Sequence, residues 1–535
     1  MVASINPYAT RAGVHALETG GNAVDAAVAV ALTLGVVDGH NSGVGGGCFM
    51  LLRRADGEII ALDGREVAPA AAARDMFLVE GEAEPRLSQT GALASGIPGS
   101  LAVYEAAARE CGRHPLRDAL LPAAELAEAG FPIDKHYADR MNVERATLAQ
   151  FPESRRIFLH PDGSPLQAGE ILRQPDLARS YRALAQGGSA WFYRGDFAQT
   201  AARWMSENGG LITAADFAGY GVRRREPVRT TYRGWEIVSF PPPSSGGVHV
   251  AEILNVLENF DLAHLPPADR VHVTAEAMKL AFADRAFWLG DPDFARVPRG
   301  LADKGYAKIL AARISLEHAL AGVEHGTPED AATNVFNKHT THFCTADAEG
   351  NWVTCTTTLN TSFGSKVVVP GTGILLNNQM DDFSIRPGVP NAFGLVGGEA
   401  NAVAAGKRPL SSMSPTLVLK DGKPVLELGA AGGPTIITQT VLNLIGVLDL
   451  GLPVDQALAQ PRFHHQWRPD ELLVEERMPP KIVDSLRARG QVVKLTPAIG
   501  ASQIIGISPG GRKLVGAAET RAEGMALGVE LPATP

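Results

Sequence analysis

A hairpin pattern in the second half of the chain places the strongest constraint on the fold. Residues 340–347 and 352–358 are rich in threonine, valine and aromatic side chains, and the polar turn 347–351 joins them. Such residues favour strands, and a short polar connection between two of these runs favours an antiparallel pair. The sequence therefore predicts a β-hairpin here, and any fold for this chain must accommodate it.

The register of this hairpin brings two threonines together. Pairing of Asp347 with Asn351 places Thr340 opposite Thr358 at the open end. The Cβ atoms of directly opposed residues lie about 5 Å apart, within reach of a contact between two hydroxyl groups. A shift of the register by one residue would remove this contact.

The composition indicates a globular protein with a large core. The chain has 535 residues, 45% of them hydrophobic, and 49 basic against 58 acidic residues give a net charge of −9. Nucleic-acid-binding proteins usually carry a basic field, so no nucleic-acid partner is expected. The longest mostly apolar run, 26–37, is too short to span a bilayer, so no membrane span is expected. No basic signal-peptide region is visible at residues 1–4.

The four cysteines are too few and too scattered to form a disulfide framework. None belongs to a CxxC pair, which argues against a zinc ribbon or a thioredoxin-type redox site. Cys344 and Cys355 could face each other in the predicted hairpin, but small buried thiols are the favoured interpretation.

Signals outside this hairpin predict a mixture of helices and strands. Near the N-terminus, a helical run that ends at the glycine pair 20–21 precedes an apolar helix, which Asn22 or Asp25 could cap. Strand-like segments follow at 48–52 and 59–62, and the turn signal between them predicts a second hairpin.

Residues 101–322 are expected to be mostly helical, with the best helix-forming stretches at 120–129 and 269–289. A rigid loop rich in proline and glycine, 241–247, leads into another predicted helix. Segment 322–339 is polar and has no clear hydrophobic period, which predicts a mobile linker.

Thr340 is the strongest candidate for a nucleophile, although a threonine in a strand is ordinarily structural. It would begin its strand directly after the predicted linker. If the bond between His339 and Thr340 were cut, the threonine would carry an α-amine beside its hydroxyl. Because an α-amine has a pKa of roughly 7.7–8.0, it can accept the hydroxyl proton at neutral pH. This pair is a recognised way to activate a weak nucleophile.

Several longer motifs resemble one family. They lie in the expected order from the segment 20–25 to the C-terminal region, and they comprise residues 340–343, 358–364, 373–383, 408–416 and 461–466. Together they resemble the γ-glutamyltranspeptidase (glutathione hydrolase) family over nearly the whole chain. The resemblance implies an α+β fold, a four-layer αββα sandwich of the N-terminal-nucleophile hydrolase type.

The resemblance also implies self-cleavage before Thr340. The products would be a large subunit, 1–339, and a small subunit, 340–535, as two interlocked pieces of one fold. Thr340 would attack the carbonyl of a γ-glutamyl amide such as glutathione, and Thr358 would hydrogen-bond the attacking hydroxyl. Water, an amino acid or a dipeptide would then accept the γ-glutamyl group. No cofactor and no metal are implied.

The substrate's α-carboxylate requires a cationic fork of donors, which arginine supplies best. By resemblance, Arg65 holds this carboxylate together with the hydroxyls of Ser411 and Ser412. Without the resemblance, the favoured interpretation of Arg65 would be an ion pair with Glu66 or Asp63, and the serine pair would be loop residues.

The α-ammonium and the developing oxyanion have their own candidate residues. Asp382, Gln379 and Asn360 match the positions that bind the ammonium in the family. Taken alone, they would be a solvated turn, a polar loop residue and a strand-end residue. Gly432 and Gly433 match the oxyanion loop, although an isolated glycine pair would be an ordinary turn. Loss of one oxyanion donor typically costs about 2.7–4 kcal/mol of barrier.

Two departures from the family pattern keep a second substrate class open. Gly64 stands where the family often has an aromatic residue, and Phe393 stands in the segment resembling the lid loop, where a tyrosine is common. Some relatives with such variations are cephalosporin acylases, which cleave glutaryl side chains. Glutaryl lacks the ammonium, so Asp382, Gln379 and Asn360 favour γ-glutamyl substrates.

Three other classes of function compete with this interpretation. The glycine-rich segments 43–47 and 244–247 could cradle phosphate, but neither has a P-loop or dinucleotide-binding spacing, so close packing is favoured. His464 and His465 could serve a metal hydrolase, yet adjacent strand residues point to opposite faces. An uncleaved, catalytically silent binding protein is compatible with every motif.

Overall fold

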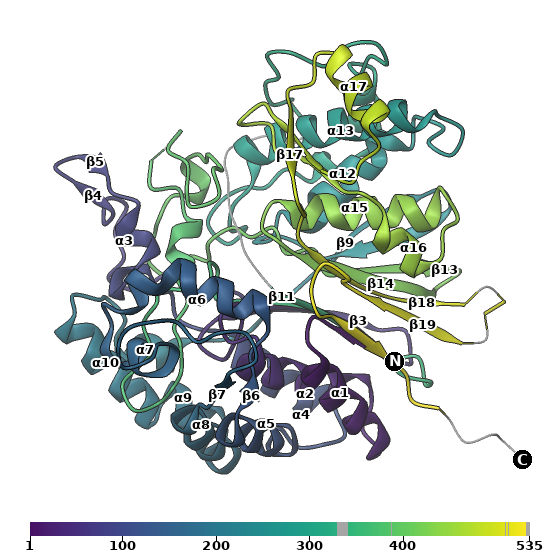
Figure 1. The fold of residues 1–535 in the computed structure, drawn as a ribbon. Helices are drawn as coiled ribbons and strands as arrows, with labels where there is room; N and C mark the ends of the chain where they lie inside the picture. The colour runs from purple at the N-terminus through teal and green to yellow at the C-terminus, as the bar shows by residue number, and fades with distance from the viewer. Residues whose placement is uncertain (329–340, 387, 509, 512, 531–535) are drawn as a thin grey trace, which may run out of the picture.

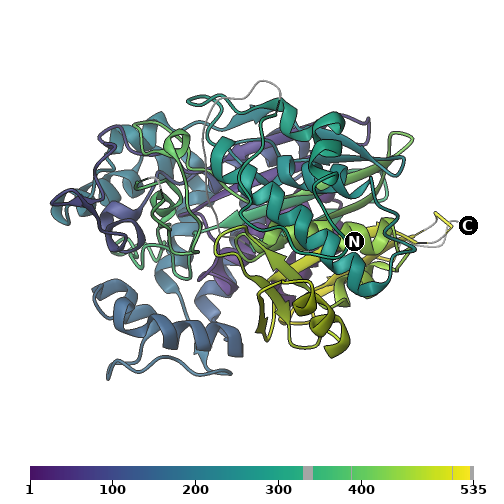
Figure 2. The same cartoon turned by 90° about the horizontal axis from the view of Figure 1, so that it is seen from above.

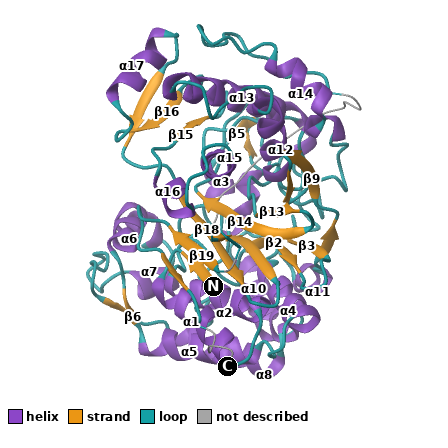
Figure 3. Ribbon diagram, turned by 90° about the vertical axis from the view of Figure 1, so that its right-hand side faces the viewer, coloured by secondary structure: helices purple, strands orange, loops and turns teal. Residues whose placement is uncertain are grey.

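Two stacked β-sheets form the centre of the molecule, and helices cover the outer face of each sheet (Figure 1). The computed structural model describes residues 1–328, 341–386, 388–508, 510–511 and 513–530. Viewed from the side, the strands lie between an upper and a lower group of helices (Figure 3). The predicted four-layer αββα arrangement is therefore confirmed.

The first sheet is antiparallel and contains seven strands among the described residues, in the order β20-β1-β11-β12-β2-β3-β8. Its strands are β1 (Val2–Ser4), β2 (Gly47–Arg53), β3 (Ile59–Gly64), β8 (Arg223–Arg225), β11 (Thr341–Ala346), β12 (Trp352–Thr358) and β20 (Met525–Leu527). The predicted hairpin of β2 and β3 is confirmed, and Met50 pairs with Leu62 in it.

The second sheet has six strands in the order β19-β18-β14-β13-β10-β9. They are β9 (Val228–Tyr232), β10 (Trp235–Ser239), β13 (Thr416–Lys420), β14 (Lys423–Ala431), β18 (Ala501–Ile507) and β19 (Leu514–Ala518). Apolar side chains of both sheets, among them Phe49, Phe240 and Leu417, pack between the layers.

Both sheets contain strands from either side of segment 329–340. In the first sheet, β11 and β12 lie between β1 and β2, and in the second sheet β13 pairs with β10. A backbone cut in that segment would leave these ladders of hydrogen bonds intact.

The central hairpin has the predicted register. Thr341 pairs with Thr357, and the amide of Asp347 donates to the carbonyl oxygen of Asn351 over 3.0 Å. Thr340 lies outside the described residues, so its pairing with Thr358 stays a prediction. The predicted linker 322–339 lies largely outside them as well.

The cysteines of this hairpin do not face each other, because Cys344 pairs with Thr354 and Cys355 with Phe343. All four cysteines are free, and three of them are buried. The interpretation of Cys344 and Cys355 as small buried thiols is confirmed. Cys48 is buried as well, whereas Cys111 is partly exposed.

The helices against the first sheet come mainly from the N-terminal half. They are α1 (Pro7–Glu18), α2 (Ala23–Val37), α4 (Ser100–Cys111), α5 (Arg117–Ala129), α6 (Lys135–Leu148), α7 (Pro152–Phe158), α8 (Pro175–Gly187), α9 (Ser189–Tyr193), α10 (Asp196–Glu207) and α11 (Ala214–Gly219). Every residue of α2 is buried, as its apolar sequence predicts. Asn22 and Asp25 both cap α2, since they form a reciprocal capping box.

The helices against the second sheet are α12 (Gly246–Leu257), α13 (Pro267–Trp288), α14 (Lys304–Ala311), α15 (Thr435–Leu448), α16 (Val454–Ala459) and α17 (Pro480–Ala488). Figure 2 looks down onto this layer, where the teal helices of the 246–311 region lie in front of the sheets. No helix in the described part of the chain is long and apolar enough to cross a bilayer.

The remaining elements lie outside the two central sheets and the helices named above. They are β4 (Leu78–Val79), β5 (Glu82–Ala83), α3 (Arg86–Gln89), β6 (Phe131–Pro132), β7 (Ile171–Leu172), β15 (Phe463–His465), β16 (Leu472–Glu475), β17 (Val493–Thr496) and short 3₁₀ turns at Ala92–Ala94, Arg299–Ala302, Gln379–Asp382 and Glu399–Asn401. The mostly helical prediction for 101–322 missed β8, β9 and β10. These strands are short, and β8 and β9 lie at sheet edges, where no apolar run marks them.

Candidate active site

Arg65 directly follows β3 and is fully buried. Its Nε donates to the carbonyl oxygen of Pro409 over 2.8 Å, and its Nη2 donates to that of Leu410 over 2.9 Å. The same Nη2 forms an ion pair with Asp382. The guanidinium therefore joins the end of the first sheet to both predicted substrate-binding segments. The alternative of an ion pair with Glu66 is present as well, in buried form, because Arg65 Nη1 lies 3.5 Å from Glu66 Oε2.

The main chain at Arg65 is held by two further side chains. Tyr220 Oη and Arg408 Nη1 each donate to the carbonyl oxygen of Arg65 over 2.9 Å. The amide of Arg65 donates to Asp63 Oδ1 over 2.9 Å. This backbone position is consequently well determined before any ligand binds.

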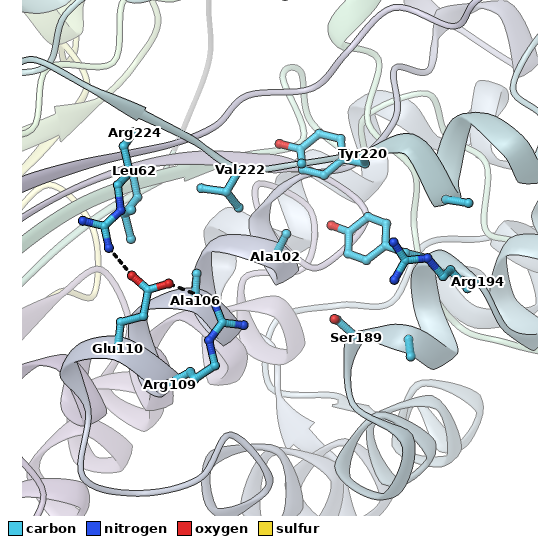
Figure 4. A pocket seen from close by; sticks show the side chains of 14 residues that line it. Leu62, Ala102, Ala106, Arg109, Glu110, Ser189, Arg194, Tyr220, Val222 and Arg224 are labelled. Carbon is cyan, nitrogen blue, oxygen red and sulfur yellow. Dashed lines mark hydrogen bonds and ion pairs between the residues drawn. The ribbon is translucent and has the colours of Figure 1, made fainter.

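Tyr220 also lines a separate cavity of about 360 Å³, shown in Figure 4. Its wall includes Tyr193 and the exposed arginines Arg109, Arg194 and Arg224, and it contains none of the predicted site residues. The cavity thus lies behind the Arg65 backbone and outside the predicted substrate site.

The three predicted ammonium-binding residues lie together and are buried. Gln379 Nε2 donates to Asp382 Oδ2 over 2.5 Å, because both residues belong to the 3₁₀ turn Gln379–Asp382. Asn360 Nδ2 donates to the carbonyl oxygen of Asn378, next to this turn, over 2.9 Å. Asn360 has a φ of 81°, a left-handed conformation that asparagine tolerates better than most residues.

Each of these residues has one oxygen without a hydrogen-bond partner in the described part of the chain: Asn360 Oδ1, Gln379 Oε1 and Asp382 Oδ1. Buried polar atoms are normally paired, and an unpaired one costs about 1–3 kcal/mol. Three acceptors in one buried cluster therefore mark a place for a ligand with several N–H donors.

Burial also controls protonation at this cluster. It raises the pKa of Asp382 to about 7, although the Arg65 guanidinium opposes the shift. Burial likewise raises the pKa of Glu66 to about 8, again against the pull of Arg65, whose Nη1 lies 3.5 Å from Glu66 Oε2. Burial therefore keeps both carboxyl groups protonated to a higher pH than is usual for Asp and Glu.

The predicted carboxylate-binding serines are buried beside the carbonyl groups that Arg65 contacts. Ser411 Oγ accepts a hydrogen bond from the amide of Met413 over 3.1 Å. Ser412 Oγ accepts one from Arg285 Nη2 over 2.7 Å. The segment that carries these serines is anchored by Ser245, whose amide and hydroxyl both donate to the carbonyl oxygen of Ser411 over 2.7 Å.

Gly432 and Gly433 form the turn from β14 into α15, and both have positive φ angles, 127° and 67°. A Cβ atom on Gly432 would lie 2.6 Å from Thr435 Oγ1, so glycine is required there. The amides of this turn lie at the N-terminal end of a 14-residue helix, where the helix dipole favours negative charge.

Thr358, Gly47 and Arg65 lie side by side across three adjacent strands of the first sheet, Arg65 directly after the end of β3. Thr358 pairs directly with Gly47, and continuation of the β2–β3 register places Arg65 beside Gly47. Since neighbouring strands are ~4.8 Å apart, the Arg65 backbone lies ~10 Å from Thr358. Thr358 is buried, and its hydroxyl accepts a hydrogen bond from the Asn360 amide over 2.7 Å.

The turn at Gly432 points toward the same end of the hairpin. Leu428 accepts a hydrogen bond from Thr354, and the ring of His342 lies where a Cβ atom on Gly429 would sit. From Leu428 to Gly429 along β14, the contacted residue in the hairpin changes from Thr354 to His342. Since His342 pairs with Thr356, the second contact lies nearer to Thr358. The end of β14 therefore approaches the end of β12, and with it the start of β11.

Close contacts surround the glycine segment 43–47 and the histidines His464 and His465. Cβ atoms on Gly45 and Gly46 would clash with the carbonyl oxygens of Leu375 and Thr358 at 2.0 and 1.8 Å, so close packing explains this glycine segment. His464 Nδ1 contacts Thr438 at 3.0 Å and His465 Nε2 contacts Asp470 at 3.1 Å, in different surroundings.

Sequence reasoning missed Arg285, Asp38 and Arg408 as supports of the site. Arg285 lies within the predicted helical stretch 269–289, where an arginine is ordinarily exposed and no local signal marks it as buried. Asp38 Oδ2 accepts a hydrogen bond from Thr341 Oγ1 over 2.6 Å, a contact between residues far apart in sequence.

Comparison with known proteins agrees with this geometry. A sequence profile described as Gamma-glutamyltranspeptidase matches residues 9–529. The chain belongs to the gamma-glutamyltranspeptidase family. The glutathione hydrolase proenzyme of Escherichia coli (strain K12) is 46% identical over 525 residues, which cover 97% of this chain and 90% of that protein. The family predicted from the sequence motifs is confirmed.

Solved structures confirm the fold of this family member. A cephalosporin acylase from Bacillus halodurans superposes with a TM-score of 0.89 at 29% identity, covering 99% of this chain and 96% of that chain. The gamma-glutamyltranspeptidase of Helicobacter pylori superposes with a TM-score of 0.60 at 39% identity, covering 61% of this chain and 96% of that chain.

Proposed function

We propose that this member of the gamma-glutamyltranspeptidase family cleaves γ-glutamyl amides such as glutathione and passes the γ-glutamyl group to water, an amino acid or a dipeptide. The observation that carries the proposal is the buried trio of unpaired acceptors on Asn360, Gln379 and Asp382. An ammonium group offers three N–H donors, so a γ-glutamyl α-ammonium would satisfy all three. Arg65, Ser411 and Ser412 would receive its α-carboxylate.

The nucleophile in this proposal is Thr340 after cleavage of the bond from His339. Before cleavage, the Thr340 hydroxyl would attack the carbonyl of His339, and the amide C–N bond would break, which frees the α-amine and leaves an ester. Water would then hydrolyse this ester to the Thr340 hydroxyl and the His339 carboxylate. The products would be 1–339 and 340–535, held together by the mixed strand order of both sheets. Relatives described as proenzymes support such a precursor.

The catalytic cycle then has two acyl-transfer steps. The α-amine of Thr340 takes the hydroxyl proton as the oxygen attacks the γ-carbonyl, and it returns the proton to the departing amine. Amides at Gly432 and Gly433 would stabilise the oxyanion of each tetrahedral intermediate. The acyl-enzyme ester is resolved when water or an amine acceptor attacks it and the threonine hydroxyl leaves.

A glutaryl-cleaving acylase is the second candidate function, favoured by the similarity to a cephalosporin acylase. The presence of glycine at position 64, where the family often has an aromatic residue, is weak support for an acylase. A Cβ atom on Gly64 would lie 2.5 Å from Val103 Cγ2, so this glycine reflects packing against α4. A glutaryl group would also leave three buried acceptors unpaired, which favours γ-glutamyl substrates.

One experiment tests the proposal. The expressed chain is run on a denaturing gel, and the smaller fragment is sequenced; it should begin Thr340-Thr341-His342. Turnover of γ-glutamyl-anilide should exceed that of glutaryl-anilide, and Thr340→Ala should abolish both cleavage and turnover. The exposed Thr520→Ala serves as the matched control and should behave as wild type. An active Thr340→Ala variant would refute the nucleophile, an uncleaved inert wild type would indicate a silent binding protein, and a preference for glutaryl would indicate the acylase.

A further inference from the structure

Helix α13 carries a fully buried arginine, Arg285, into the predicted carboxylate-binding segment. Its Nη2 donates to Ser412 Oγ and its Nε donates to Ser245 Oγ, each over 2.7 Å. Arg65 contacts the carbonyl oxygens of Pro409 and Leu410 in the same segment. Two guanidinium groups from different layers of the fold therefore hold the residues that precede and include Ser412.

These contacts determine the direction of the hydroxyl groups. A guanidinium has only donors, so Ser412 Oγ and Ser245 Oγ must both act as acceptors toward Arg285. The Ser245 hydrogen is used in the bond to the carbonyl oxygen of Ser411. The two hydroxyl oxygens lie 3.4 Å apart, well beyond the usual ~2.7–2.8 Å for such a bond. Within the described residues, the Ser412 hydrogen therefore remains available for an incoming acceptor.

We propose that Arg285 is a positioning residue that determines specificity for the substrate's α-carboxylate. It presents Ser412 as a hydrogen-bond donor and adds positive charge behind that hydroxyl. Because a charged donor polarises the hydroxyl that accepts from it, the Ser412 hydroxyl becomes a better donor toward a carboxylate. This inference rests on the proposed function, in which Ser412 receives the carboxylate of a γ-glutamyl group.

The test compares ligands that differ only in the carboxylate. Wild type, Arg285→Met and Arg285→Lys are assayed with γ-glutamyl-anilide and with 4-aminobutanoyl-anilide, which keeps the amine and the amide. We expect Arg285→Met to raise KM for γ-glutamyl-anilide about 10- to 100-fold, as for loss of a hydrogen bond to a charged group. Its kinetics with 4-aminobutanoyl-anilide should be unchanged. Arg285→Lys should be intermediate, since it keeps the charge and loses the two-pronged contact.

A purely structural role would reduce turnover of both anilides by the same factor, and that result would overturn the proposal. Ser412→Ala supplies a second criterion. It should weaken γ-glutamyl-anilide binding in wild type and have little further effect in Arg285→Met, because the two residues act through one hydroxyl. Equal losses in the two backgrounds would also overturn the proposal.

Binding without turnover separates this inference from the proposed function. Calorimetry with L-glutamate and 4-aminobutyrate needs no nucleophile, and wild type should bind glutamate more tightly. Arg285→Met should lose that preference even if the protein hydrolyses no anilide, and a retained preference would refute the role of Arg285. If Arg285→Met does not fold, Ser245→Ala tests the same contact. It removes the acceptor of Nε and the hydroxyl bond to the carbonyl oxygen of Ser411, while the Ser245 amide still donates to that carbonyl.

Discussion

Arg65 and Asp382 form a fully buried ion pair in which Arg65 Nη2 donates to Asp382 Oδ2. A γ-glutamyl group carries two complementary charges. Its α-carboxylate can pair with the arginine, and its α-ammonium can pair with the aspartate. Binding of this zwitterion would give each protein charge a second partner without leaving either one unpaired. Isolated buried charges are costly, so the pair favours ligands that bring both charges together.

Replacement of Asp382 should change substrate preference rather than abolish the site. Asp382→Asn keeps a hydrogen-bonding group of similar size and removes the charge that an ammonium needs. We expect kcat/KM for γ-glutamyl-anilide to fall about 10- to 100-fold, the range for loss of a charged hydrogen bond. Turnover of glutaryl-anilide, which has no ammonium, should stay equal or rise. An equal loss for both anilides would contradict the assignment.

Binding of the product L-glutamate should depend on pH through Asp382. Burial raises the pKa of Asp382 to about 7, so the carboxylate becomes fully available to an ammonium only above that pH. The competitive inhibition constant of glutamate should therefore decrease as pH rises from 5 to 8, by up to tenfold per pH unit well below pH 7. Glutarate, measured in parallel, should show no such tightening. A flat profile for glutamate would contradict this prediction.

Asp38 should make the folded protein less stable at higher pH. Burial raises the pKa of Asp38 to about 7, despite its hydrogen bonds from Thr341 and Asn41. Because the folded state binds the proton more tightly than the unfolded state, stability from this group is present below about pH 4 and is lost as pH rises to about 7.

The measurement is the free energy of unfolding of wild type and Asp38→Asn between pH 4 and 8. Wild type should lose stability relative to the variant by an amount on the order of a few kcal/mol over this range. Asn41→Ala is the control, since it removes a neighbour of Asp38 without removing the titrating group. Parallel curves for wild type and Asp38→Asn would show that Asp38 does not titrate there.

A side chain at Gly432 should impair turnover. The Cβ atom of Gly432→Ala would lie 2.6 Å from Thr435 Oγ1 and 2.9 Å from the Cα atom of Gly500, so the turn must move. Displacement of an oxyanion donor costs about 10²–10³ in kcat. Gly422→Ala is the matched control, because Gly422 also has a positive φ but has no atom within 4 Å of the added Cβ. Equal kcat for the two variants would contradict the assignment.

Local sequence signals predicted those parts of the fold whose residues are close in sequence. The β11–β12 hairpin, its register and the helix cap at Asn22 all follow from short-range patterns. The four-layer αββα arrangement was predicted from the family motifs and not from the hydrophobic periodicity of the sequence. Strands β9 and β10 escaped prediction because they are five residues long and lie between helical segments.

The sequence motifs named candidate residues for the site but not their mutual contacts. The motifs named Arg65 and Asp382 separately, and only the three-dimensional structure shows that they are ion-paired. Arg285 was missed because its partners Ser245 and Ser412 are distant in sequence, and an arginine in a helix is ordinarily exposed. Such contacts depend on tertiary packing between layers, which no local pattern encodes.

The most direct test of the account is to trap the acyl-enzyme and locate the acyl group. The purified protein is mixed with a γ-glutamyl-anilide, quenched in acid within its first turnovers, digested, and analysed by mass spectrometry. One added γ-glutamyl group is expected on the peptide that begins with Thr340, bound as an ester that mild base releases. A γ-glutamyl group on any other residue, or release of the aniline with no covalent adduct at any quench time, would contradict it.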